Sequence, residues 1–430
     1  MLWFLFCVYV GVCLAMMASA TWRKEDRLQF PFLAGGTVLL MVCVPLSGLM
    51  LDHTGPSTSS LERFTTMAIL CQLMAWAGYV FPWKFKERLL YRFDSRSLAA
   101  SAVILSFFGF YFGYQLSNIE PETAANGNWT GIATIFVTLS QVSRYGFVLA
   151  AIVFCRDRYW SMLLAAIPQI IIYVSQFLGG RRSPTGEFLI IVVTLILFYR
   201  KKSLPLWLLL AGMASVAVFS YNIGAIRSNV GQTFGERIDS FTSSDPLSAL
   251  TDEGMVENKG YIEIANAVNF MEAKAIGGNY TYGLHFWNQL VFGFVPAQFV
   301  GVETKAALQF DLADDNILTG FEKSNGTCES GIAEAFMAFG YFGCLLFFIM
   351  GAGFRWLWHE SMRGNILCQF VLMLNILPGI MSFSIQLWTM LNGLVNILIF
   401  AGPFLWWSST SLHGWRLRNV ERRLGVTPKS

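Results

Sequence analysis

The sequence predicts an all-α, polytopic integral membrane protein with about eleven transmembrane helices and one large outer loop. Of its 430 residues, 55% are hydrophobic and 13% are charged, whereas a typical soluble domain carries about 25% charged residues. The mean hydropathy is +0.51. Apolar runs of about 20 residues, long enough to cross roughly 30 Å of hydrocarbon, recur along the chain. Because backbone groups cannot stay unpaired in lipid, these spans must be helices. The composition excludes a disordered chain, a disulfide scaffold and an ordinary soluble enzyme.

The apolar runs define eleven spans. The first run lacks a basic start and is followed by Trp22-Arg23-Lys24, which favours a span over a cleaved signal peptide. The last two spans are separated only by a tight turn, so a count that differs by one stays open. The spans cover residues 2–19, 30–51, 64–83, 98–116, 131–155, 160–178, 184–199, 204–222, 331–354, 366–386 and 387–407.

Lysine and arginine are concentrated on one side of the predicted bundle. Alternate connections and the C-terminal tail hold 20 of the 30 basic residues. An excess of basic residues marks the cytoplasmic side, so we predict that the N-terminus faces out and the C-terminus faces in. Because topology already accounts for these basic loops, they are poor evidence for nucleic-acid binding.

One outer connection is much longer than the others. Residues 223–330 contain 14 acidic and 6 basic residues, and loops beyond about 15 residues are usually functional or disordered. The aromatic run 284–301 within it predicts an interfacial or re-entrant helix, or alternatively the core of a folded loop. The predicted domains are a bundle of eight spans (1–222), the outer loop (223–330), three further spans (331–407) and a basic cytoplasmic tail (408–430).

Two adjacent arginines, Arg181 and Arg182, stand in an outer connection, where basic residues are disfavoured. Ser183 is a good N-cap and Pro184 suits the first turn of the following helix. Free N–H groups, the helix dipole and two guanidinium groups would converge there, which predicts a phosphate site. The alternative is that both arginines reach toward lipid headgroups.

Three further charged residues are not explained by topology. Arg144 lies near the middle of the fifth span, where a charge is costly and usually functional. If Arg144 instead forms a structural ion pair, the expected partner is an acidic residue near the outer face, such as Glu334. Arg227 begins the long loop and is a second candidate phosphate contact, or a solvated loop residue. Glu334 lies one turn into the ninth span, where it is either a general base or part of an ion pair.

Two residues of the aromatic run and its surroundings complete the candidate substrate-binding set. His285 is more often a packed histidine than a catalyst at such a position, and Lys305 is a weak phosphate candidate. The four histidines and eight cysteines show no metal-ligand or disulfide spacing, so no metal or other cofactor is predicted.

Several short motifs together resemble the O-antigen polymerase family, which comprises bacterial oligosaccharide repeat-unit polymerases. The segments 180–184 and 224–227 are similar to its arginine motifs beside mid-chain spans. The stretches 278–280, 294–296 and 302–305 resemble its loop motif, although Ala297 and Ala306 replace the usual arginine and proline. Glu334 with residues 339–343 looks like the start of the span after the loop.

The resemblance implies a fold similar to lipid-phosphosugar (GT-C-like) glycosyltransferases in the bacterial cytoplasmic (inner) membrane. Such enzymes polymerise undecaprenyl-pyrophosphate-linked oligosaccharides on its outer face into O-antigen or exopolysaccharide. The implied partners are this lipid-linked oligosaccharide, membrane lipid, a chain-length regulator and a flippase. The leaving pyrophosphate needs positive charge, which guanidinium groups supply without a metal. We therefore expect Arg181, Arg182 and Arg227 on the pyrophosphate, Arg144 nearby, and Glu334 as base or orienting residue.

Three other classes remain open on sequence grounds. A flippase or transporter of lipid-linked sugars also needs arginines in the membrane, although its usual internal repeat is not visible here. An O-antigen ligase shares the donor chemistry and differs only in the acceptor. A membrane assembly protein without catalysis would tolerate single arginine changes outside the packed spans.

Overall fold

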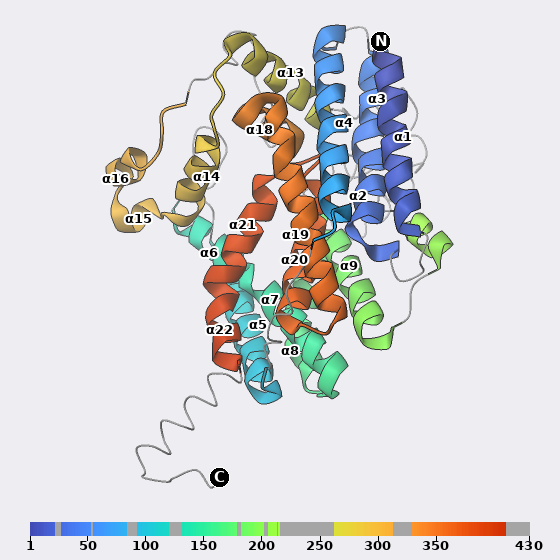
Figure 1. Cartoon of the computed structure of the whole chain (residues 1–430). Helices are drawn as coiled ribbons and strands as arrows, with labels where there is room; N and C mark the ends of the chain where they lie inside the picture. Colours follow the sequence, from blue (N-terminus) through green and yellow to red (C-terminus); the bar gives the residue numbers. More distant parts are fainter. Residues whose placement is uncertain are drawn as a thin grey trace, which may run out of the picture.

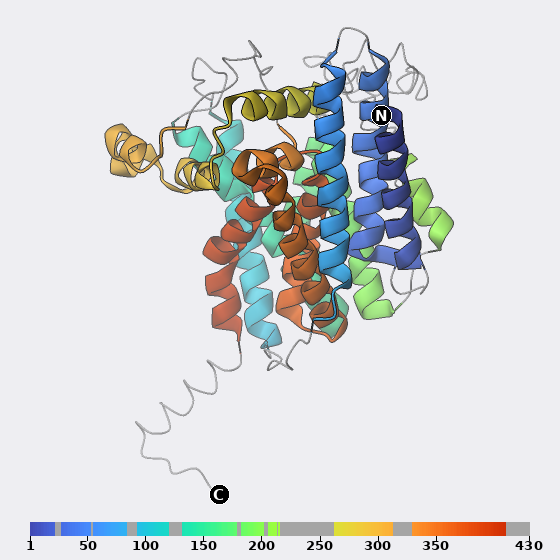
Figure 2. The same ribbon diagram turned by 45° about the horizontal axis from the view of Figure 1, so that its top comes forward.

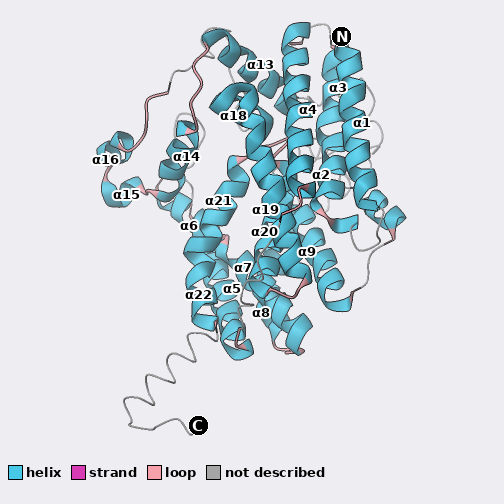
Figure 3. Cartoon of the chain, viewed as in Figure 1, coloured by secondary structure: helices cyan, strands magenta, loops and turns pink. Residues whose placement is uncertain are grey.

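The structure is a computed structural model of the whole chain (Figure 1). It describes residues 1–21, 27–52, 55–83, 93–119, 131–178, 182–201, 205–212, 214–215, 262–312 and 329–409. Within these residues the regular structure is helical, with loops between the helices and no β-strand (Figure 3). Phe93 and Ser409 form an isolated antiparallel bridge. The all-α prediction is confirmed for the described residues.

The helices stand side by side in a bundle, with the N-terminus at one end (Figure 1). Those before residue 210 are α1 (Leu2–Thr21), α2 (Phe30–Val38), η2 (Leu39–Cys43), α3 (Val44–Leu51), α4 (Thr58–Val80), α5 (Ser95–Ser117), α6 (Ile132–Ser140), α7 (Val142–Asp157), α8 (Met162–Leu178) and α9 (Arg182–Arg200). Those after it are α13 (Ile262–Gly277), α14 (Leu284–Phe294), α15 (Ala297–Val300), α16 (Val302–Ala307), α18 (Gly331–Phe339), η4 (Gly340–Gly343), α19 (Cys344–Met362), α20 (Ile366–Met381), α21 (Trp388–Asn396), η5 (Ile397–Ala401) and α22 (Gly402–Ser408).

Seven of the described helical segments are long and apolar enough to cross a membrane, and two shorter apolar helices, Met162–Phe177 and Ile366–Met381, accompany them. This length and composition support a membrane-embedded protein. The 23-residue α4 also runs along the bundle, with Glu62 and Arg63 in the part that precedes the predicted 64–83 span. Most of the predicted span 204–222 lies outside the described residues. The seven segments are Leu2–Thr21, Phe30–Leu51, Ser95–Ser117, Ile132–Asp157, Ser183–Arg200, Gly331–Met362 and Trp388–Ser408.

Several spans are interrupted rather than continuous. The α6–α7 span breaks at Gln141, and π-helical turns interrupt the second span at η2 and the last span at η5. Gly340 has a φ of +58°, which L residues rarely adopt, and it ends α18 before η4 and α19 continue. Breaks within a span free backbone groups, and in membrane proteins they occur where the chain borders a cavity or is buried in protein.

Small residues bring two helix pairs into close contact. A Cβ on Gly78 or Gly351 would lie 2.1 or 2.0 Å from a backbone oxygen across the α4–α19 interface. A Cβ on Gly109 would lie 2.2 Å from the Ser143 backbone nitrogen, and one on Gly146 2.3 Å from that of Ser106, across the α5–α7 interface. Close backbone approach through small residues is the usual way in which membrane helices associate.

The described part of the long loop lies across and beside one end of the bundle. α13 lies roughly across the bundle at the end where the chain begins, and α14, α15 and α16 extend beside it (Figure 2). Arg63 of α4 and Glu272 of α13 form a salt bridge. α14 has 11 residues, or about 16 Å at 1.5 Å per residue, which is too short to span a bilayer. The aromatic run 284–301 therefore adds no span, as predicted.

The α5–α7 contact gives a direct test of the packing. We expect Gly109→Ala to destabilise the protein by about 1–3 kcal/mol, because the new methyl group meets backbone rather than a movable side chain. Gly113→Ala, one turn along the same helix, is the matched control, since its Cβ would lie 3.7 Å from the Ser140 Cβ. Thermal unfolding in detergent compares the two. Equal unfolding temperatures would contradict the close packing at Gly109.

Candidate functional site

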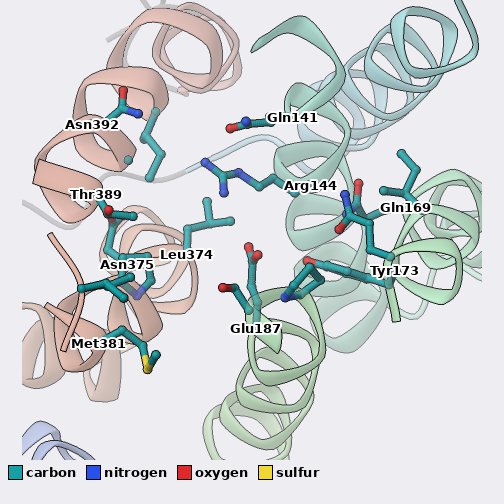
Figure 4. Close-up of a pocket in the computed structure, with 18 of the residues that line it drawn as sticks. Gln141, Arg144, Gln169, Tyr173, Glu187, Leu374, Asn375, Met381, Thr389 and Asn392 are labelled. Atoms are coloured by element: carbon teal, nitrogen blue, oxygen red, sulfur yellow. The ribbon is translucent and has the colours of Figure 1, made fainter. Parts of the chain in front are cut away.

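A polar cavity of about 700 Å³ lies inside the helix bundle (Figure 4). Helices α6 to α9 form one side of it, α20 and α21 form the other, and Glu263 of α13 borders it from the loop. Glu263 thus gives the cavity a border at the end of the bundle where α13 lies (Figure 1). Its polar lining residues are Ser140, Gln141, Arg144, Gln169, Tyr173, Gln176, Ser183, Glu187, Glu263, Asn375, Thr389 and Asn392.

Polar atoms without partners gather at this cavity. Buried polar atoms in folded proteins nearly always make a hydrogen bond, so a group of exceptions indicates a site for a polar ligand or water. Gly393 of α21 packs closely against one of them, since a Cβ there would lie 2.8 Å from Asn375 Oδ1. Five buried atoms of the lining have no hydrogen-bond partner among the described residues: Arg144 Nε, Gln169 Oε1, Tyr173 Oη, Glu187 Oε1 and Asn375 Oδ1.

Arg144 and Glu187 face this cavity from two different helices, α7 and α9 (Figure 4). Arg144 Nη2 donates a hydrogen bond of 3.3 Å to the Tyr145 hydroxyl, and the guanidinium lies 5.2 Å from that ring. The carboxylate that interacts electrostatically with Arg144 is Glu187, and not Glu334, the acidic residue named as an example from the sequence. Arg144 and Glu187 nevertheless do not form a salt bridge with each other.

The sequence-predicted phosphate site leads into the same cavity. α9 begins at Arg182, and the next two residues, Ser183 and Pro184, line the cavity. The predicted short helix beginning near residue 184 is therefore present. The side chain of Arg182, together with all of Arg181 and Arg227, lies outside the described residues. Their role in binding phosphate stays a prediction.

Glu334 is buried away from the cavity lining, with 1% of its surface exposed. Its Oε1 accepts a hydrogen bond of 3.2 Å from Gln289 of α14, and its Oε2 accepts one of 3.1 Å from the Trp388 backbone N–H at the start of α21. A carboxylate at a helix N-terminus satisfies free N–H groups and the helix dipole. Glu334 therefore joins the outer loop to the helix that carries Thr389 and Asn392.

His285 and Lys305 also lie away from the cavity lining. His285 is 5% exposed, and its Nδ1 lies 2.7 Å from the Thr281 hydroxyl. Burial, with Lys274 nearby, lowers the pKa of His285 to about 4. Lys305 Nζ donates to the Phe292 backbone oxygen at 2.9 Å and lies 4.9 Å from the Phe292 ring. Partial burial lowers the pKa of Lys305. In the described structure both side chains hold parts of the loop together.

The low pKa of His285 predicts how the loop responds to acid. The imidazole is neutral in the folded loop, whereas in an unfolded loop it takes up a proton near its usual pKa of about 6.5. The contribution of neutral His285 to the free energy of unfolding of the loop is therefore fully present above pH 6.5. This contribution falls as the pH drops toward 4, by up to about 3 kcal/mol. Hydrogen exchange in 284–294 should speed up over this range. His285→Gln should remove the pH dependence, and an unchanged profile in this variant would contradict the assignment.

Sequence reasoning missed Glu187 and the amides of α8 and α20. Glu187, like Arg144, is an ionisable residue in a predicted span, but it lies near the start of its helix, where an acidic residue is common. Gln169 and Asn375 are uncharged, and nothing in the sequence shows that their helices face each other across the cavity. The described residues contain no group of three or more His, Cys, Asp or Glu side chains that could hold a metal ion.

The comparisons with known proteins bring no relative: no protein-family model, curated protein or solved structure matches the chain. The fold and the cavity define its class, an all-α membrane-embedded protein with a charged polar cavity inside the bundle.

Proposed function

We propose that this protein is a membrane glycosyltransferase that polymerises lipid-linked oligosaccharide repeat units, of the kind carried on undecaprenyl pyrophosphate. The proposal rests on one observation: Arg144 and Glu187 line the same polar cavity but do not form a salt bridge with each other. A ligand suited to this space offers an anion to the guanidinium and a hydroxyl to the carboxylate. A phosphosugar has both groups, and the surrounding amides suit sugar hydroxyls.

The proposed reaction transfers the growing glycan from its lipid carrier to a sugar hydroxyl of an incoming repeat. The leaving group is a pyrophosphate, and fixed positive charge lowers the energy of the transition state in which its charge develops. We assign this role to Arg144 together with Arg181, Arg182 and Arg227, so the transfer needs no metal. Of the two roles expected for Glu334, its hydrogen bonds to α14 and α21 favour the orienting role.

The proposal places the reaction at the outer face of the bacterial cytoplasmic membrane, with the N-terminus out and the C-terminus in the cytoplasm. Glu263 of α13 borders the cavity, and α13 lies across the end of the bundle where the chain begins (Figure 2). A lipid carrier in the bilayer can present its pyrophosphate at this depth. A chain-length regulator and a flippase are the proposed protein partners.

Glycan profiles from a deletion strain test this function. Loss of the chain-length ladder, with the single-unit product kept and the ladder restored by the gene, is the expected result. Loss of all glycan product would contradict polymerisation and favour a ligase or flippase. An unchanged chain-length ladder would contradict all three functions: polymerase, ligase and flippase.

The interrupted spans favour a second candidate function, transport of the same lipid-linked sugar. Transporters bind substrates at helices broken near the membrane midplane, and the α6–α7 break at Gln141 borders the cavity. A purified protein in vesicles separates the two functions, because a transporter moves the lipid-linked sugar between leaflets without lengthening it.

A further inference from the structure

We infer that Glu187 is the proton acceptor for the attacking sugar hydroxyl, an inference that rests on the proposed glycosyl transfer. Two carboxylates line the described part of the cavity, Glu187 and Glu263. Glu187 lies on α9, five residues after its start and about 8 Å deeper at 1.5 Å per residue. Glu263 belongs to α13 of the loop, at the cavity border.

The position of Glu187 leaves its carboxylate available to a ligand. Its Oε1 is buried without a hydrogen-bond partner among the described residues, and Arg144 is not bound to it in a salt bridge. A carboxylate that served only to neutralise Arg144 would be expected to bond to it, because a buried pair is stabilised by close geometry. Both groups instead point into the same space (Figure 4).

The surroundings suit a sugar hydroxyl held between the two charges. Gln169 Oε1 of α8 likewise has no hydrogen-bond partner among the described residues, and Tyr173 of the same helix interacts electrostatically with the Glu187 carboxylate (Figure 4). A general base must be within hydrogen-bond reach of the proton that it removes, and the cavity of about 700 Å³ holds a sugar in that position.

The step balances as a single displacement. The acceptor hydroxyl oxygen bonds to the anomeric carbon of the donor glycan while the O–H proton passes to the Glu187 carboxylate. The bond between the anomeric carbon and the pyrophosphate oxygen breaks, and its electron pair leaves with the pyrophosphate beside Arg144. The protonated Glu187 then returns its proton to water.

Substitution of Glu187 tests this role. We expect Glu187→Gln to lower the elongation rate by about a hundredfold or more, the usual contribution of a general base. Binding of the lipid-pyrophosphate-linked repeat should stay within a few-fold, since glutamine preserves shape and hydrogen bonding. Glu62→Gln, on α4 and outside the cavity lining, is the matched control and should keep elongation near the wild-type rate.

A rescue experiment distinguishes a general base from a carboxylate with a purely structural role. It also provides a second test of Glu187 if the Glu187→Gln variant does not fold. Glu187→Ala leaves room for a small acid, so added formate should raise its elongation rate, while the control variant Glu62→Ala should not respond. Normal elongation by Glu187→Gln, or lost substrate binding without rescue of Glu187→Ala, would overturn the assignment. Wild-type protein that binds but never elongates would instead overturn the proposed function.

Discussion

Replacing Arg144 by methionine is expected to lower glycan elongation by about a hundredfold or more, the cost of losing one fixed charge at a developing anion. The guanidinium faces a cavity inside the bundle, where low dielectric strengthens its effect. Arg144→Lys should retain part of the activity, because an ammonium keeps the charge but loses the planar fork. The measurement is the rate of chain elongation by purified variants in vesicles.

The control for Arg144 lies on the same helix. Arg156, at the other end of α7, is paired with Asp157 at 2.8 Å and does not line the cavity. Arg156→Met should therefore leave elongation within a few-fold of wild type. Normal elongation by a folded Arg144→Met variant would remove Arg144 from the mechanism.

The second large effect is expected at the start of α9. Changing Arg181 and Arg182 together to alanine should weaken binding of the lipid-linked pyrophosphate by at least about tenfold, since charge-assisted hydrogen bonds contribute about 1.5–3 kcal/mol each. The residues that follow them, Ser183 and Pro184, line the cavity. Binding should be measured directly, with turnover as a second readout.

Arg200 at the opposite end of α9 provides the matched control, because its substitution changes the charge of the same helix away from the cavity. Arg200→Ala should bind the lipid-linked pyrophosphate normally. Equal affinities of the double variant and wild type would show that the two arginines contact lipid headgroups instead.

The spans were predictable because the hydropathy of a segment reflects the free energy of transferring its side chains from water to lipid. The predicted spans 2–19, 30–51 and 98–116 correspond to α1, the α2–η2–α3 segment and α5 within a few residues. The breaks at Gln141 and within η2 were not predictable, since both segments are apolar on either side of the break. They depend on which neighbours accept the freed backbone groups.

The candidate site was predictable only where a charged residue stands in an otherwise apolar segment. Arg144 stands out as a charge in an apolar run, and the structure places it at the cavity. Glu187 gives a weaker signal, because an acidic residue in the first turns of a helix also suits the helix dipole. The role of Glu334 depends on Gln289 and Trp388, which approach it only through tertiary packing.

Reconstitution of the purified protein distinguishes polymerisation of the lipid-linked repeat from its transport in one experiment. Vesicles would contain the protein and a single undecaprenyl-pyrophosphate-linked repeat unit, with products followed by mass spectrometry and the leaflet position of the substrate followed in parallel. A polymerase is expected to give a ladder of products that grow by whole repeat units and to release free undecaprenyl pyrophosphate. Movement of the substrate between leaflets without any lengthening would contradict it.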